Sequence, residues 1–184
     1  MKGKIHIFSW HALIAHKMAI LRNKNTKSFW FRQLIHEITL VMGGEVLKNL
    51  TLKKIKVQTP MAQATCHQVE KPPYIVPVLR AGLSMQEAMW ELLPEMPSYD
   101  IGLRRKEDGK PTVTIEEYLN KLPAHISAGR MVIILDPMIA SGESACHAIS
   151  MVKKTGAKNI VFMGIVCCDV GLNRIRQAHP DVQI

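Results

Sequence analysis

Five consecutive apolar residues at 131–135 form the clearest strand pattern in the chain. A run with no polar residue suits a strand that is buried on both faces, as strands of parallel sheets are. A loop and a helical pattern at 144–154 follow it directly. Parallel strands need such crossover connections, so the pattern predicts an α/β fold built on a parallel sheet.

Other segments continue the alternation of helices and strands. An amphipathic helix is predicted at 10–22 with Ser9 as its N-cap, and a second helix is predicted after Ser28, its far end left open by Gly43 and Gly44. The further predictions are β-rich segments from Leu52, strands at 74–79 and 160–166, helices at 84–93 and up to Ala178, a turn at Gly156, and a flexible hairpin formed by 100–105 and 113–118 around Asp108, Gly109 and Lys110. Residues 180–184 look like the start of one more strand.

Length and composition exclude several classes of protein. With 184 residues the chain fits a single domain, and 47% apolar and 21% charged residues are ordinary soluble values. No apolar run approaches the roughly 20 residues of a membrane span, and the N-terminus lacks a signal-peptide pattern, so a cytoplasmic protein is expected. The four cysteines show no C-x-x-C spacing and are expected to be reduced thiols in the core, namely Cys66, Cys146, Cys167 and Cys168.

The formal net charge of +9 raises the question of nucleic-acid binding. The basic residues are spread thinly, and no aromatic residues are interleaved with them as a stacking surface would require. A solvated basic surface that favours a phosphorylated small substrate is therefore preferred over a nucleic-acid interface.

The loop at 136–144 carries the most specific chemistry. At a strand-to-helix junction, backbone N–H groups without helical partners and the helix dipole together favour an anion such as phosphate. Ser141 and Ser144 add hydroxyl donors, and Gly142 allows close approach of the backbone. Asp136 can accept hydrogen bonds from sugar hydroxyls or approach Mg²⁺. Taken alone, the same pattern also fits an ordinary helix cap.

The loop resembles the ribose-phosphate loop of type I phosphoribosyltransferases, and its Asp136-Pro137-Met138 start is similar to the uracil-specific branch. Further segments match that branch in the same order along the chain: 5–8, 22–26, 76–82, 101–105, 121–123 and 178–182. The sequence is therefore identified as a member of the uracil phosphoribosyltransferases, with a type I phosphoribosyltransferase-like parallel sheet flanked by helices, N-terminal helices and a flexible hairpin.

The resemblance implies a reaction and a set of site residues. Phosphoribosyl pyrophosphate and uracil would give UMP and pyrophosphate in pyrimidine salvage, with Mg²⁺ bound through the substrate and no dedicated metal ligand. Asp136 and Arg105 are the implied catalytic residues. The implied substrate-binding residues are Arg80, Arg105, Asp136, Pro137, Met138, Ile139, Ala140, Ser141, Gly142, Glu143 and Ser144. Within this set the two arginines would hold the pyrophosphate, because a guanidinium binds paired oxygens as a fork. A homo-oligomer is also implied, and GTP is left open as an effector.

Two features depart from the family pattern. Glu143 stands where the uracil branch usually has glycine, and a carboxylate facing the ligand would repel phosphate. The resemblance also implies a uracil-recognising segment after Val182, whereas the sequence ends at Ile184. We therefore expect residues 1–184 to form one phosphoribosyltransferase domain without that segment, and to form little UMP by themselves. The alternative hypothesis is a non-catalytic relic that binds phosphoribosyl pyrophosphate or a partner subunit.

Overall fold

A computed structural model describes residues 3–106 and 114–184, and its centre is a five-stranded sheet. In spatial order the strands are β5 (Thr114–Asn120), β4 (Ile101–Lys106), β3 (Tyr74–Leu79), β6 (Met131–Leu135) and β8 (Asn159–Met163). β3 pairs in parallel with β4 and β6, and β6 pairs in parallel with β8. Only β5 is antiparallel to its neighbour. The predicted parallel α/β sheet is therefore confirmed for four strands, with one antiparallel edge.

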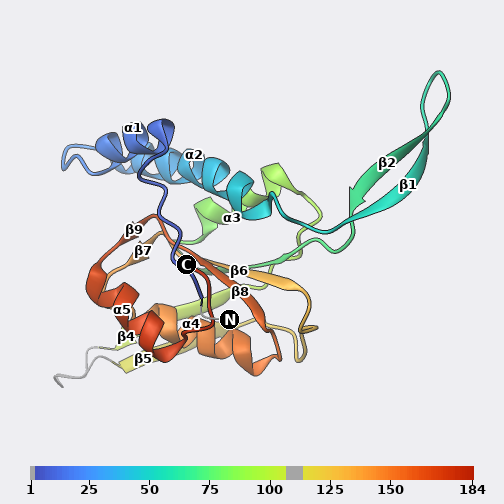
Figure 1. The fold of residues 1–184 in the computed structure, drawn as a ribbon. Coiled ribbons are helices and arrows are strands. Elements are labelled where there is room, and N and C mark those ends of the chain that lie inside the picture. The colour runs from blue at the N-terminus through green and yellow to red at the C-terminus, as the bar shows by residue number, and fades with distance from the viewer. Residues whose placement is uncertain (1–2, 107–113) are drawn as a thin grey trace.

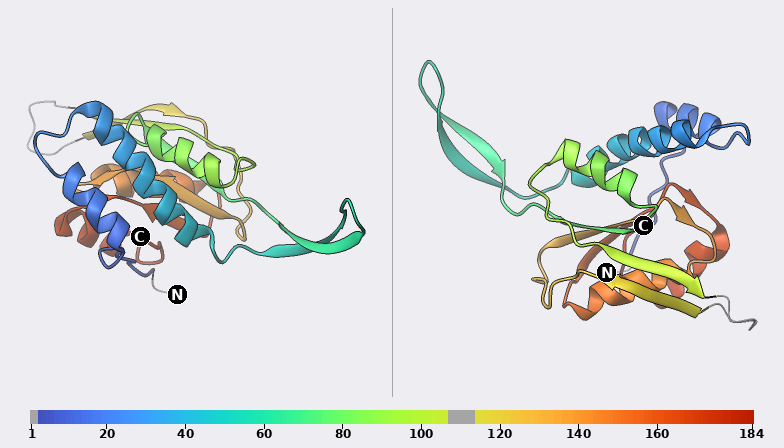
Figure 2. Two further views of the ribbon diagram at one scale, coloured as in Figure 1. Left: turned by 90° about the horizontal axis from the view of Figure 1, so that it is seen from above. Right: turned by 180° about the vertical axis from the view of Figure 1, so that it is seen from behind.

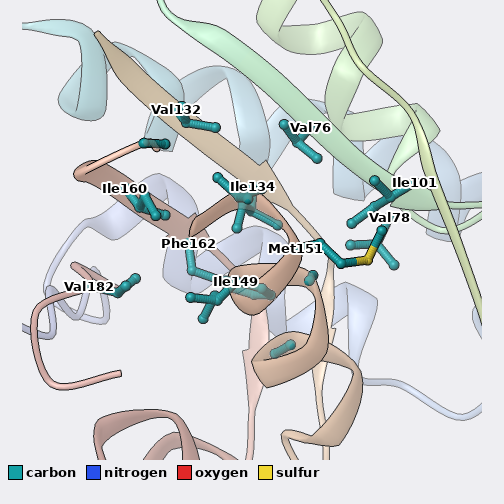
Figure 3. Packing of buried hydrophobic residues seen from close by; sticks show 14 of the residues in the cluster. Val76, Val78, Ile101, Val132, Ile134, Ile149, Met151, Ile160, Phe162 and Val182 are labelled. Atoms are coloured by element: carbon teal, nitrogen blue, oxygen red, sulfur yellow. The ribbon is translucent and has the colours of Figure 1, made fainter. Parts of the chain in front are cut away.

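Helices cover both faces of this sheet (Figure 1, Figure 2). One face carries α1 (Ala12–Leu21), α2 (Ser28–Leu47) and α3 (Leu83–Leu92), and the other carries α4 (Glu143–Lys154) and α5 (Asp169–Ala178). The side chains of β6 alternate between the two faces: Val132 and Ile134 belong to the cluster under α4, and Ile133 and Leu135 to the cluster under α2 and α3. Figure 3 shows the first cluster. Burial on both sides explains why the 131–135 run contains no polar residue.

The N-terminal helix begins later than predicted. A turn in which His11 N–H donates to Phe8 O at 3.0 Å leaves Ser9 outside the helix. His11 is the N-cap instead, and its Nδ1 accepts from Ile14 N–H at 3.5 Å. The prediction of Ser9 as cap is therefore wrong. Trp10 is 71% exposed, so the predicted apolar stripe is only partly buried.

α2 continues to Leu47 through the glycine pair. A Cβ on Gly43 would lie 2.7 Å from Leu92 Cδ1 and 2.8 Å from Met89 Sδ, so the missing side chain lets α2 and α3 pack closely. Gly44 faces open space. The first glycine thus serves helix packing, and neither of them ends the helix.

The strand predicted at 160–166 is in fact two strands. β8 ends at Met163, and the two-residue β9 (Val166–Cys167) pairs in parallel with β7 (Met138–Ile139). The N–H groups of Ile165 and Val166 both donate to Pro137 O, at 3.1 and 2.9 Å. These two hydrogen bonds to one carbonyl direct the chain away from β8 at Gly164. The prediction of one continuous strand is therefore wrong.

The remaining elements lie at the periphery. β1 (Leu52–Gln58) and β2 (Gln63–Val69) form an antiparallel arm that projects from the body (Figure 1). The predicted hairpin is confirmed as β4 and β5, whereas its connection at 107–113, with Asp108, Gly109 and Lys110, lies outside the described residues. All four cysteines are free. Cys146 and Cys167 are half-buried and pack against the core cluster under α4, as expected, whereas Cys66 is half-buried in the arm and Cys168 is exposed, so the expected core position is wrong for these two.

The two ends of the chain meet beside β8. Gln183 forms a parallel bridge to Val161, in agreement with a strand beginning there, and Ile184 exchanges backbone hydrogen bonds with Lys4 and His6. Within residues 3–106 and 114–184, no helix combines the length and apolar character that crossing a membrane requires.

Candidate active site

Sheet topology places the predicted site residues at one edge. β3 and β6 are parallel neighbours with Pro77 opposite Leu135, so Arg80 and Asp136 follow the two strands at the same carboxyl edge. β4 is the parallel neighbour of β3 on its other side. Arg105 lies in β4, and its side chain is outside the part of the chain that the structure describes. This edge is where ligands bind in open α/β sheets.

The loop after β6 is held by the backbone of the β8–β9 connection. Asp136 N–H donates to Met163 O at 3.2 Å, and Cys168 N–H donates to Ile139 O at 2.8 Å. Pro137 and Ile139 are buried, so these two predicted binding residues anchor the loop with their side chains. Met138 and Ala140 are exposed, and Ser141 and Ser144 are half-buried.

Two glycines meet where the loop enters α4. Gly142, the N-cap of α4, has φ 81°, and a Cβ there would lie 2.7 Å from Gly171 O. A Cβ on Gly171 would in turn lie 2.5 Å from Ala140 O. Gly142 was predicted from the sequence and Gly171 was not. The available signal was a glycine inside a helical pattern, which often marks a close approach of two backbones.

The loop leaves several backbone donors unused. Within the described ranges, the N–H groups of Ala140, Gly142, Glu143 and Ser144 donate to no protein acceptor. They precede or begin a helix of 12 residues, whose dipole adds positive potential at this end. Four unpaired N–H groups at a helix start favour binding of an anion such as a phosphate group.

Alanine at Gly142 tests this geometry. We expect Gly142→Ala to lower the free energy of unfolding by about 1–2 kcal/mol, because a Cβ is disfavoured at positive φ and would meet the Gly171 backbone. Phosphate binding should weaken as the loop shifts. Gly129→Ala is the control, since a Cβ there meets nothing within 4 Å and φ is ordinary. Chemical denaturation measures both variants, and equal stability of the two would contradict the close packing.

Asp136 is a buried carboxyl beside this loop. It is 9% exposed, and its Oδ1 accepts from Met138 N–H at 3.2 Å. Burial raises the pKa of the Asp136 carboxyl to about 6, and the hydrogen bond from Met138 offsets part of the rise. A carboxylate with so few donors has lone pairs left for sugar hydroxyls or for Mg²⁺.

Arg80 offers a cation at the same edge. Its side chain is exposed and has no ion-pair partner among the residues that the structure describes. The turn that carries it packs tightly on the sheet, since a Cβ on Gly82 would lie 2.5 Å from Leu135 O. The guanidinium is therefore available to an anionic ligand.

A cavity of about 1070 Å³ lies elsewhere, between α1, α2, β8 and the N-terminal segment. None of residues 136–144 lines it. The candidate site is the loop with the charges beside it, because the sequence motif and the N–H groups without a protein acceptor in the described ranges lie there. Among the described residues, no three His, Cys, Asp or Glu side chains are grouped to hold a metal ion.

Comparison with known proteins identifies the family. A family model named "Uracil phosphoribosyltransferase" matches residues 8–184. The uracil phosphoribosyltransferase of Clostridium perfringens is 43% identical over 175 residues, covering 95% of this chain and 82% of the relative. The enzyme of that name from Streptococcus mutans is 42% identical over 183 residues, covering 99% and 85%.

Solved structures agree with the fold. The AQ2163 protein of Aquifex aeolicus is 28% identical with a TM-score of 0.87, covering 98% of this chain and 84% of that one. A purine phosphoribosyltransferase of Pyrococcus horikoshii has a TM-score of 0.57 at 17% identity, covering 84% and 83%, and supports the fold alone. Given the family match and the relatives above 40% identity, the chain belongs to the uracil phosphoribosyltransferase family.

Proposed function

We propose that this protein transfers the 5-phosphoribosyl group of phosphoribosyl pyrophosphate to N1 of uracil, giving UMP and pyrophosphate. The observation that carries the proposal is the 136–144 loop, with its unused N–H groups at the start of α4, in a chain whose relatives bear this enzyme's name. Because those relatives are named as enzymes, the alternative of a non-catalytic relic is not favoured.

The proposed roles follow from the charges at the carboxyl edge. The loop binds the 5′-phosphate, Asp136 accepts hydrogen bonds from the ribose hydroxyls, and Arg80 and Arg105 bind the pyrophosphate. The bond from C1′ to pyrophosphate breaks and its electron pair leaves with pyrophosphate, the bond from C1′ to N1 forms, and the N1 proton of uracil is released to solvent. Binding of both the 5′-phosphate and the pyrophosphate holds C1′ in line with N1 of uracil. The same contacts stabilise the negative charge on the departing pyrophosphate.

Mg²⁺ is proposed as the cofactor, bound through the donor. The buried carboxyl of Asp136 fits this arrangement, since Mg²⁺ in phosphate sites commonly uses one or two carboxylates and the substrate's own oxygens. The ion supplies charge neutralisation of the pyrophosphate. A cytoplasmic location, a homo-oligomer and a GTP effector stay predictions of the family resemblance.

Donor binding and UMP formation test the proposal. Calorimetry with phosphoribosyl pyrophosphate should show saturable binding that weakens when EDTA removes Mg²⁺. UMP formation from labelled uracil is measured with the chain as it stands and with the C-terminal segment of the C. perfringens relative joined to it, because the match covers 82% of that relative. Cytosine and adenine serve as control bases. Absence of donor binding, or of UMP in both forms, would refute the function.

A further inference from the structure

Glu143, the residue that departs from the family pattern, is paired in this structure with an arginine of the neighbouring helix. Its Oε1 lies 2.6 Å from Arg174 Nη1, and the two side chains are 28% and 42% exposed. The distance is that of an ion pair, although the N–H is not aligned on the oxygen as a hydrogen bond. Glu143 Oε2 is buried and has no hydrogen-bond partner among the described residues.

The packing of α5 explains why Arg174 reaches this carboxylate. Gly171 holds the first turn of α5 against the loop through its contacts with Gly142 and Ala140. Arg174 is three residues further along the helix, so it lies on the same face as Gly171 and points to the start of α4. The close contact of the two glycines therefore sets the position of the ion pair.

The ion pair with Arg174 compensates the negative charge that Glu143 places beside the loop. Its carboxylate follows directly on the loop whose N–H groups are free to bind an anion, and an uncompensated negative charge there would repel a phosphate. Arg174 supplies the opposite charge from the α5 side.

We propose that Arg174 is a positioning residue of the donor site, which holds the Glu143 carboxylate on the α5 side and cancels its charge so that the loop accepts a phosphate. The inference rests on the proposed function for the identity of the donor. In this chain the phosphate affinity of the loop then depends on the ion pair between Glu143 and Arg174. A glycine at 143, as in the family pattern, carries no charge, so the loop would not require such a pair.

Charge variants test the pair. Arg174→Ala should raise the dissociation constant for phosphoribosyl pyrophosphate about tenfold, since the lost charge acts on binding of the phosphate. In the form joined to the C-terminal segment of the C. perfringens relative, the KM for phosphoribosyl pyrophosphate should rise equally with little change in kcat. Arg174→Lys should keep most of the affinity. Adding Glu143→Gln to Arg174→Ala should restore it. Arg176→Ala is the matched control, because Arg176 is exposed on the same helix and its removal changes the net charge equally.

The outcomes separate the inference from the function. Unchanged donor affinity in Arg174→Ala at low salt, or no rescue by Glu143→Gln, would overturn the inference, and a lower melting temperature alone would mark Arg174 as structural. Ribose 5-phosphate is the second probe. If the wild-type chain binds it with the same dependence on Arg174 but does not bind phosphoribosyl pyrophosphate, the inference stands and the proposed function fails. Binding of neither compound by the wild-type chain overturns both.

Discussion

Replacing Asp136 with asparagine is expected to stabilise the folded chain and to impair its site at the same time. At about pH 7.5 the free energy of unfolding should rise by about 1–3 kcal/mol, because a buried charge is removed. Affinity for phosphoribosyl pyrophosphate with Mg²⁺ should fall about 10- to 100-fold, the usual loss when hydrogen bonds to a charged group disappear. Thermal or chemical denaturation and calorimetry measure the two effects.

The stability effect has a defined pH dependence. Burial raises the pKa of the Asp136 carboxyl from 3.8 to about 6, so the folded chain holds this proton more tightly than the unfolded chain. The contribution of Asp136 to the free energy of unfolding is therefore highest below about pH 4 and is lost as the pH rises through about 6. The difference between Asp136→Asn and wild type should grow over that window, up to about 3 kcal/mol for a shift of about two pKa units.

Asp181→Asn is the matched control, because its pKa is shifted the other way. The hydrogen bond from Lys153 Nζ, at 2.6 Å, lowers the pKa of the Asp181 carboxyl. That favourable contribution is present at neutral pH and is lost as the pH falls, so Asp181→Asn should destabilise the chain slightly near pH 7.5. If Asp136→Asn were destabilising too, the Asp136 carboxylate would have a stabilising partner in the folded protein, contrary to its burial.

The sequence was sufficient to predict the elements that local pattern determines. β3 and β6 have the predicted bounds. Strands that are buried on both faces are continuous apolar runs, so the first and last residues of each run mark the ends of the strand. α4 begins one residue before its predicted start, because Gly142, with φ in the left-handed region, is its N-cap. The loop between β6 and α4 could be located for the same reason, since a strand, an acidic residue and a glycine-containing turn are local features.

What the sequence could not supply depends on contacts between distant segments. The break between β8 and β9 arises because Pro137 O accepts two N–H groups from a segment that lies more than 25 residues further along. The packing of Gly171 on Gly142 and the pairing of Arg174 with Glu143 likewise join α5 to α4. Glu143 could be identified as a departure from the family, but its partner became apparent only from the packing of the two helices.

Replacing Arg80 with lysine is expected to weaken donor binding strongly and to leave stability unchanged. Lysine keeps the charge but loses the guanidinium fork, so affinity for phosphoribosyl pyrophosphate should fall about 10- to 100-fold, as when a bidentate contact to an anion is lost. The free energy of unfolding should change by less than about 0.5 kcal/mol, because Arg80 is exposed and has no ion-pair partner within the described residues. Calorimetry and denaturation measure these quantities separately.

Arg130→Lys is the control, and it is expected to lower stability without changing donor affinity. Arg130 Nε donates to Pro72 O at 2.8 Å, and its guanidinium lies 4.0 Å from the centre of the Tyr74 ring. It precedes β6 and so lies at the amino edge of the sheet, away from the loop. Lysine there should cost about 1 kcal/mol of stability through the lost hydrogen bond and ring contact, with donor affinity unchanged. A stability loss in Arg80→Lys with unaltered donor binding would instead make Arg80 a structural residue, and the pyrophosphate would then need another cation.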